Sequence, residues 1–182
     1  MEDRPSRAPS EAELSESRRR RRHMRLALRV QAAQGRWPLR QVRPEDAESL
    51  GRLMHDAYRG TVDDEGETLD QSVAEARDAM AGKYGEFLGR CSFLIEDDSR
   101  PVCATVVTLW EGRPLLAFVV TDPDHKGRGM GTLLIKRTID TLLEERYQEL
   151  DLFVTRVNEP AVRIYERLGF QDVEGWDLPI AD

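Results

Sequence analysis

The sequence predicts a single α/β domain preceded by a polar segment, and two observations carry this prediction. Between about Leu39 and Leu178, short apolar runs typical of strands alternate with segments whose apolar residues recur every three or four positions, as in helices. One apolar run also leads through a glycine-rich loop directly into such a helix. At 182 residues the chain is long enough to bury one core.

The first part of this region predicts one strand, two helices and two more strands. A strand at 39–43 leads to Pro44, which the first turn of a helix tolerates and which acidic residues follow. Strands at 91–95 and 102–110 are joined by a turn that ends at Pro101. The apolar positions of the two helices are Leu50, Leu53, Met54, Ala57 and Tyr58, then Leu69, Val73, Ala76 and Met80.

The second part predicts two strands, two helices and a last strand. A turn at 111–114 leads into a strand at 115–121, and the next strand follows at 150–155. A further helix begins near Asn158, so the expected order is β-α-α-β-β-β-α-β-α-β. The helix after the glycine loop is marked by Leu134, Ile135, Ile139, Leu142 and Leu143.

Three glycines, Gly127, Gly129 and Gly131, fill the loop before that helix. Glycine lets the backbone adopt left-handed angles and approach a ligand closely. The helix points unpaired N–H groups and the positive end of its dipole at the loop, a geometry that binds phosphate. The spacing matches neither the dinucleotide fingerprint nor the nucleotide-triphosphate loop. An ordinary turn between strand and helix is the alternative.

Two segments resemble motifs of the GNAT family of acetyltransferases. Lys126 to Gly131 is similar to the signature (R/Q)-x-x-G-x-(G/A), with Pro123 three residues before it. Lysine departs there from the usual arginine or glutamine; it keeps a positive charge but lacks the planar guanidinium. Asn158 to Phe170 resembles the later motif N-x-x-A-x-x-x-Y-x-x-x-G-F. An amphipathic helix with a buried tyrosine is the alternative for this second segment.

The resemblance implies a GNAT fold, with a mixed, mostly antiparallel central sheet of about six to seven strands flanked by about four helices. It also implies acetyl-CoA as co-substrate, with the loop holding its diphosphate. The strand that ends at Thr121 would separate from its neighbour beyond Leu150 and offer backbone groups to the pantetheine arm and the acetyl oxygen. The residues expected to bind the cofactor are Val119, Val120, Thr121, Lys126, Gly127, Arg128, Gly129, Met130, Gly131, Thr132 and Asn158.

The resemblance makes Tyr165 the candidate general acid for the departing thiolate. An ordinary tyrosine, with a pKa of about 10, stays protonated at neutral pH. No general base is assigned, because Leu115 stands where some family members have a glutamate. Glu111 and Asp122 are near in sequence but fall at turns, and a chain of water molecules is an alternative.

The acceptor is expected to be a primary amine of a small molecule or peptide. The run 63–67 contains four acidic residues between two predicted helices, a region that borders the acceptor site in the family. Clustered carboxylates would attract a cationic amine, although a solvated acidic loop also explains the run. In the family, the last strands form part of the acceptor site. Here they must fit into residues 171–180, so this side of the site is less defined by the sequence.

Residues 1–35 differ in composition from the rest of the chain. They hold nine arginines and five acids, whereas the whole chain has a formal charge of −7. Because apolar periodicity is lacking up to Arg22, we expect a basic, disordered tail at 1–35 and the GNAT domain at 36–182. The run Arg18–Arg22 allows a nucleic-acid or nuclear-import role, but its composition favours a solvated tail. Met24 is an alternative initiator.

Other kinds of site are disfavoured. Cys91 and Cys103 fall in predicted strands and fit two buried thiols of a cytoplasmic protein better than a disulfide. His23, His55 and His125 lack metal-ligand spacing, so no metal is expected. No run has the length needed to span a membrane.

Three functional hypotheses remain. The first is an acetyl-CoA-dependent N-acetyltransferase that acts on a primary amine. The second is a non-catalytic module that senses CoA or acyl-CoA. The third, a nucleic-acid binder that uses Arg18–Arg22, is the weakest because the rest of the chain is acidic. Family members often form dimers, so a homodimer stays open.

Overall fold

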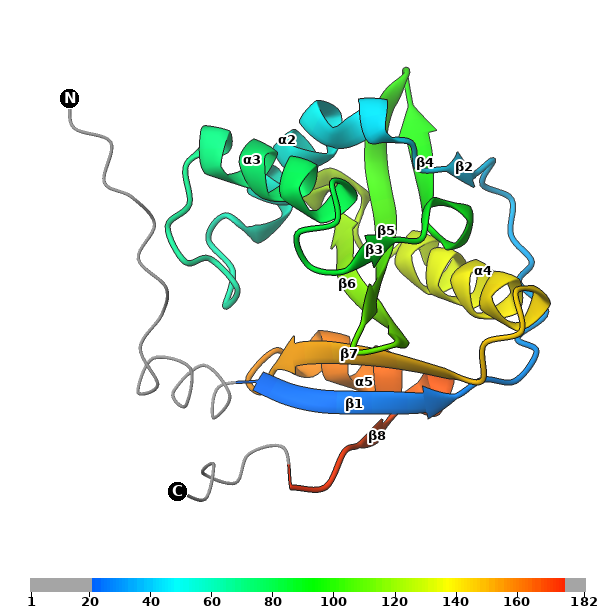
Figure 1. Cartoon of the computed structure of the whole chain (residues 1–182). Coiled ribbons are helices and arrows are strands. Elements are labelled where there is room, and N and C mark those ends of the chain that lie inside the picture. The colour runs from blue at the N-terminus through cyan, green and yellow to red at the C-terminus, as the bar shows by residue number, and fades with distance from the viewer. Residues whose placement is uncertain (1–20, 176–182) are drawn as a thin grey trace.

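The computed structural model describes residues 21–175, which form one mixed sheet with helices against it (Figure 1). Within these residues the strand order is β2-β4-β5-β6-β7-β1-β8, with β3 paired to β5. The strand pairs are antiparallel except β6 with β7. The strands are β1 Arg21–Ala27, β2 Arg40–Gln41, β3 Glu86–Phe87, β4 Phe93–Asp97, β5 Arg100–Trp110, β6 Arg113–Thr121, β7 Glu149–Thr155 and β8 Gln171–Asp172. The helices are α2 Ala47–Tyr58, α3 Leu69–Met80, α4 Met130–Glu144 and α5 Glu159–Leu168.

This architecture confirms the α/β class, the mostly antiparallel sheet and the four helices, counted over residues 21–175. The sheet has eight strands rather than six to seven. Two short or charged strands, β1 and β3, were not expected from the apolar pattern.

The helices pack on the two faces of the sheet. Leu94 packs in one apolar cluster with Leu50 of α2, whereas its neighbour Phe93 packs in another with Leu134 of α4. Because successive residues of a strand point to opposite faces, α2 and α4 lie on opposite sides of the sheet. α3 packs tightly on α2, since a Cβ at Gly51 would lie 2.4 Å from the Cα of Val73.

β1 changes the expected domain boundary. Residues 21–27 pair antiparallel with β7 along their whole length, so they belong to the sheet rather than to a disordered tail at 1–35. Met24 and Leu26 of β1 are buried in the core, and Arg25 is 2.6 Å from the buried carboxylate of Asp151. Residues 1–20, which contain most of the arginine run, lie outside the described part of the chain.

Within the described residues, the segment after α5 forms one short strand. β8 contains only Gln171–Asp172 and pairs with β1, so β1 takes the position beside β7. Residues 176–182, which include the end of the segment expected to form the last strands, are outside the described residues.

β6 and β7 separate soon after they meet. Their parallel pairing consists of Leu115 with Asp151 and Leu116 with Leu152. The register between β5 and β6 shifts next to this point, where Val107 pairs with Leu116 and Val106 with Phe118. Ala117 is therefore an extra residue in β6, a bulge that bends the strand away from β7. The expected opening of the sheet beyond Leu150 is present.

Candidate active site

The glycine loop lies where β6 ends and α4 begins. Gly127 and Gly129 have φ angles of 75° and 79°, in the left-handed region that favours glycine. Gly129 caps α4 without a side-chain bond, and the N–H of Leu133 donates to its carbonyl. The N–H groups of residues 130–132 precede this first helical bond, so they have no partner within the helix.

Side chains do not fill the space in front of this loop. A Cβ added at Gly127 or Gly129 would meet no heavy atom within 4 Å. At Gly131 it would lie 3.6 Å from Oγ1 of Thr121, an ordinary contact. The first turn of α4 also lacks an acidic residue that would repel an anion. Open space and unpaired amides at a helix N-terminus fit a diphosphate group.

His125 anchors the start of the loop between two carboxylates. Its Nδ1 lies 3.0 Å from Asp122 and its Nε2 lies 3.1 Å from Asp97. Asp122 is buried and also pairs with Arg100 at 3.1 Å. The hydrogen bond between Asp122 and His125 lowers the pKa of Asp122 and raises the pKa of His125. Asp122 is therefore a paired structural residue, neither a solvated turn residue nor a free base.

A cleft of about 970 Å³ runs from this loop to α5. One wall is the segment from Val119 to Thr132, and the other includes the loop after α2 and the start of α5. All the residues that the sequence assigned to the cofactor or to catalysis line this cleft: Val119, Val120, Thr121, Lys126, Gly127, Arg128, Gly129, Met130, Gly131, Thr132, Asn158 and Tyr165. The two family-like motifs thus face one space.

α5 presents Tyr165 to the cleft. The side chain of Asn158 caps this helix by accepting a bond from the N–H of Ala161 at 3.2 Å, and Gly169 ends it with a φ of 99°. Ala161 and Tyr165 both line the cleft, as their spacing predicts. The Tyr165 ring packs at a steep angle on Phe170, with centroids 5.7 Å apart. Burial, with a smaller effect of Asp63, raises the pKa of Tyr165, so its hydroxyl is protonated at neutral pH.

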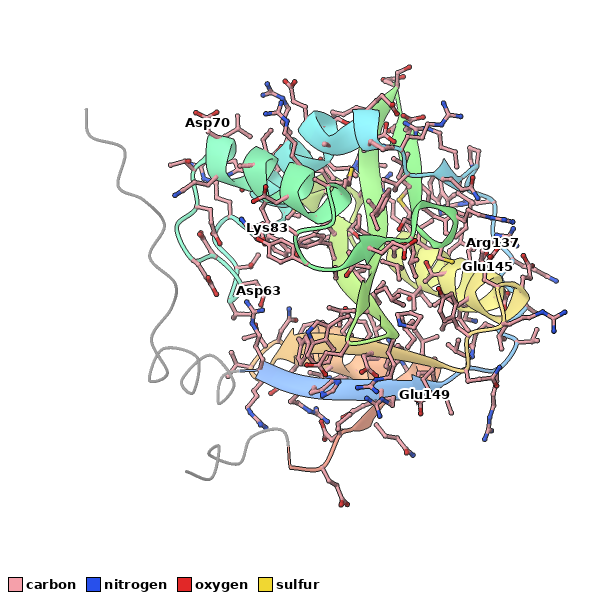
Figure 2. All side chains as sticks on the ribbon, in the orientation of Figure 1. Asp63, Asp70, Lys83, Arg137, Glu145 and Glu149 are labelled. Carbon is pink, nitrogen blue, oxygen red and sulfur yellow. The ribbon has the colours of Figure 1, made fainter. Side chains whose placement is uncertain are left out.

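A smaller acidic pocket of about 180 Å³ adjoins the cleft. It contains carboxylates from the loop between α2 and α3 and from α3 itself: Asp63, Glu65, Glu67 and Glu75. Figure 2 shows Asp63 on this loop. Val119, Asn158 and Tyr165 line both the pocket and the cleft. The acidic run expected near the acceptor therefore faces a cavity, except Asp64, which binds the N–H groups of Gly60 and Gly66.

Two residues of this pocket were missed by sequence reasoning. Tyr58, at the end of α2, lines both cavities, and burial raises the pKa of its hydroxyl. Glu75 of α3 is half-buried, and burial together with the charge of Glu67 raises the pKa of its carboxyl. Tyr58 has the spacing of a core residue and Glu75 that of a surface residue, so no local signal marks either one.

Other expected features have simple structural roles. Cys91 and Cys103 are buried free thiols, and burial raises the pKa of each to about 11. Cys91 ends a 3₁₀ turn before β4 rather than lying in a strand.

Between residues 21 and 175, no helix is long and apolar enough to cross a membrane, and no cluster of three His, Cys, Asp or Glu side chains could hold a metal ion.

Known proteins with similar sequences are acetyltransferases. Streptothricin acetyltransferase of Streptomyces lavendulae is 27% identical over 101 residues, which cover 56% of this chain and 53% of that protein. Mycothiol acetyltransferase of Acidimicrobium ferrooxidans is 31% identical over 155 residues, which cover 79% of this chain and 48% of that protein. The chain thus spans about half the length of these two relatives.

A solved structure shows the same fold. The paiA N-acetyltransferase of Thermoplasma acidophilum, in complex with coenzyme A, matches with a TM-score of 0.60 at 15% identity, over 74% of this chain and 89% of that one. The model of the Acetyltransferase (GNAT) family matches residues 47–170. This span contains the glycine loop, the opening between β6 and β7, and α5. The chain therefore belongs to the Acetyltransferase (GNAT) family.

Proposed function

We propose that this protein is an acetyl-CoA-dependent N-acetyltransferase that transfers the acetyl group to a primary amine. The observation that carries the proposal is the junction of two cavities at Tyr165. One cavity begins at a loop suited to a diphosphate, and the other is lined by carboxylates suited to an ammonium group. A transferase needs such a junction, because its two substrates must meet at one point.

The chain's own groups fit acetyl-CoA at the first cavity. The unpaired N–H groups of residues 130–132 would bind the diphosphate, with the charges of Lys126 and Arg128 beside them. The strand edge from Val119 to Thr121 has no pairing with β7 and would bind the pantetheine arm and the thioester oxygen. When bound, acetyl-CoA supplies an activated acetyl group.

Tyr165 would donate a proton to the departing sulfur. Its hydroxyl is protonated at neutral pH, and its place where the two cavities meet would let it donate when negative charge develops on the sulfur. The amide of Asn158 bonds to Ala161 and to Asp63 and still has a second N–H for the cofactor arm. We therefore give Asn158 a positioning role for α5 and the facing loop beside its role in cofactor binding.

Glu75 is our candidate for the group that receives the proton of the amine. It lies in the acidic pocket, and its raised pKa brings a carboxylate closer to the basicity that proton removal needs. Asp63 shares the pocket but accepts a hydrogen bond from Asn158. Glu75 is thus the better base of the two.

The experiment measures thiol release from acetyl-CoA over a panel of primary amines. We expect amine-dependent release and a mass increase of one acetyl group on the accepted amine. Saturable CoA binding with no amine ever acetylated would instead support the alternative, a non-catalytic CoA sensor. A cytoplasmic location, where Cys91 and Cys103 stay reduced, and a homodimer remain proposals beside the activity.

A further inference from the structure

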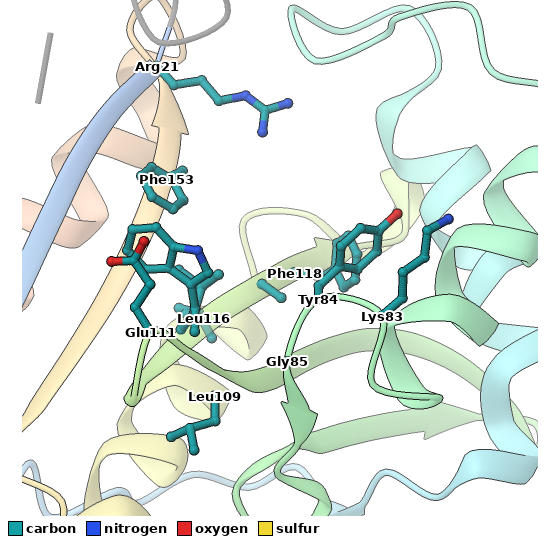
Figure 3. A pocket seen from close by; sticks show the side chains of 12 residues that line it. Arg21, Lys83, Tyr84, Gly85, Leu109, Glu111, Leu116, Phe118 and Phe153 are labelled. Carbon is teal, nitrogen blue, oxygen red and sulfur yellow. The ribbon is translucent and has the colours of Figure 1, made fainter. Parts of the chain in front are cut away.

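A third cavity, of about 580 Å³, lies beyond the acidic pocket; its lining is mostly apolar and includes four aromatic rings, so we call it the aromatic cavity (Figure 3). Its rings come from β5, β6, β7 and the loop before β3, and they are Trp110, Phe118, Phe153 and Tyr84. Figure 3 shows Tyr84 and Phe153 on opposite sides of the space, with Arg21 at one end. The function proposed above makes no use of this cavity.

The walls of the cavity are fixed by backbone and ring contacts. The rings of Trp110 and Phe153 meet edge to face, with centroids 5.2 Å apart. Gly85, with a φ of 103°, brings its loop onto β5, because a Cβ there would lie only 1.9 Å from the carbonyl oxygen of Leu109. This close approach places the neighbouring Tyr84 on the rim.

The aromatic cavity adjoins the acidic pocket at the opening of the sheet. Leu116, Ala117, Phe118, Phe153 and Arg21 line both spaces. Ala117 is the bulge residue of β6, and it is also the smallest side chain at this shared boundary. An amine held by the pocket can therefore extend past Ala117 toward the rings.

The charges of the two spaces differ. The acidic pocket contains four carboxylates and one guanidinium, that of Arg21. The aromatic cavity instead has two cations, Arg21 and Lys83, and one carboxylate, Glu111. A molecule with an ammonium group at one end and an uncharged apolar body at the other matches this change, whereas a second ammonium group would meet cations.

We propose that the acceptor is an aromatic primary amine, in which a short alkyl chain joins the ammonium group to an aryl ring. The ammonium group enters the acidic pocket, and the ring packs among Trp110, Phe118, Phe153 and Tyr84. This inference rests on the proposed acetyl transfer and names its substrate class.

The test compares the acetylation of 2-phenylethylamine, n-butylamine and spermidine. We expect kcat/KM for 2-phenylethylamine to exceed that of each other amine by about tenfold or more, because only its ring stacks with the aromatic walls. Two variants probe the cavity. Ala117→Leu narrows the boundary, and Tyr84→Ala removes a ring that is 40% exposed and so contributes little to the core.

In both variants the ratio of kcat/KM between 2-phenylethylamine and n-butylamine should fall about tenfold. Ala74→Leu is the control for Ala117→Leu, because it also replaces alanine with leucine but at an exposed position of α3 outside all three cavities. It should leave the ratio unchanged. If Ala117→Leu does not fold, the kcat/KM ratio of Tyr84→Ala still tests whether the aromatic cavity binds the ring. Acetylation without preference for the ring, or a preference that both variants keep, overturns this inference alone. Absence of turnover with every amine overturns the proposed function as well.

Discussion

The side-chain amide of Asn158 donates a hydrogen bond to the carboxylate of Asp63, with 2.7 Å between the two atoms. This bond joins the start of α5 to the loop between α2 and α3, and both residues line the cleft and the acidic pocket. The amide oxygen of Asn158 also caps α5. One side chain therefore starts the helix that carries Tyr165 and holds the loop that carries the acidic run.

Asn158→Asp separates these two roles. It keeps the capping oxygen but replaces the donor with a charge that repels Asp63. We expect the free energy of unfolding to fall by about 1–2 kcal/mol, because the hydrogen bond is lost and two carboxylates face each other, and we expect a several-fold higher KM for the amine, because the loop is displaced. Asn158→Ala also loses the cap and should cost about 1 kcal/mol. Urea denaturation and steady-state kinetics measure both effects; an unchanged KM in Asn158→Asp would show that the bond has no part in binding.

Tyr165→Phe tests the proton donor. The variant keeps the ring against Phe170 but lacks the hydroxyl, so kcat should fall by about 10²-fold or more with the fold intact. Tyr58→Phe is the matched control, because it removes a second buried hydroxyl from the same cavities. We expect a much smaller fall in that variant. If kcat falls more in Tyr58→Phe than in Tyr165→Phe, Tyr58 rather than Tyr165 is the proton donor.

The raised pKa of Glu75 should make both activity and stability depend on pH. As a base it must be ionised, so kcat/KM should rise with pH through the raised pKa of Glu75, and Glu75→Gln should lose this limb of the profile. The sign for stability is opposite. A carboxyl whose pKa is raised on folding loses stabilising free energy as pH rises from its ordinary 4.5 through the raised value. Glu75→Gln should therefore be at least as stable as the wild type at neutral pH, and a clear loss of stability there would contradict a functional role.

A chain that begins at Met24 tests the role of β1. It lacks Arg21, which lines two cavities, and Arg22, which is 2.6 Å from Asp172. It also places a charged amino group at a residue that is 0% exposed. We expect the free energy of unfolding to fall by about 2 kcal/mol or more relative to a chain that begins at Arg21. Equal stability of the two chains by urea denaturation would exclude a structural role for residues 21–23.

The glycine loop and α5 could be predicted because their signals are local. Gly127, Gly129 and Gly169 have the left-handed angles that their positions demanded, and Asn158 caps the helix that it was expected to start. The cleft joins these motifs as the resemblance implied. That they bind acetyl-CoA remains a proposal.

β1 could not be predicted because its signal is not local. Its sequence is rich in charge, and only Met24, Leu26 and His23 are buried. Its arginines are tolerated in the sheet because distant carboxylates neutralise them: Arg22 pairs with Asp172 and Arg25 with Asp151. These partners lie more than a hundred positions away, so no window of the sequence contains both members of a pair.

The aromatic cavity and Glu75 escaped prediction for the same reason. Trp110 and Phe153 are ordinary strand residues until β7 places one ring against the other. Glu75 lies on a helix whose periodicity indicates only that it is not a core position. Tertiary packing alone turns these side chains toward the opening between β6 and β7.

We propose that main-chain amides at residues 127–132 bind the diphosphate of CoA. Calorimetric titration of the wild type compares CoA with pantetheine, which lacks both the diphosphate and the 3′-phosphoadenosine attached to it. We expect CoA to bind about 10²-fold more tightly than pantetheine. We also expect Gly131→Ala, whose added Cβ would lie at an ordinary contact distance of 3.6 Å from Oγ1 of Thr121, to reduce this difference while leaving the melting temperature nearly unchanged. Equal affinities for CoA and pantetheine in the wild type would show that the loop does not bind the diphosphate.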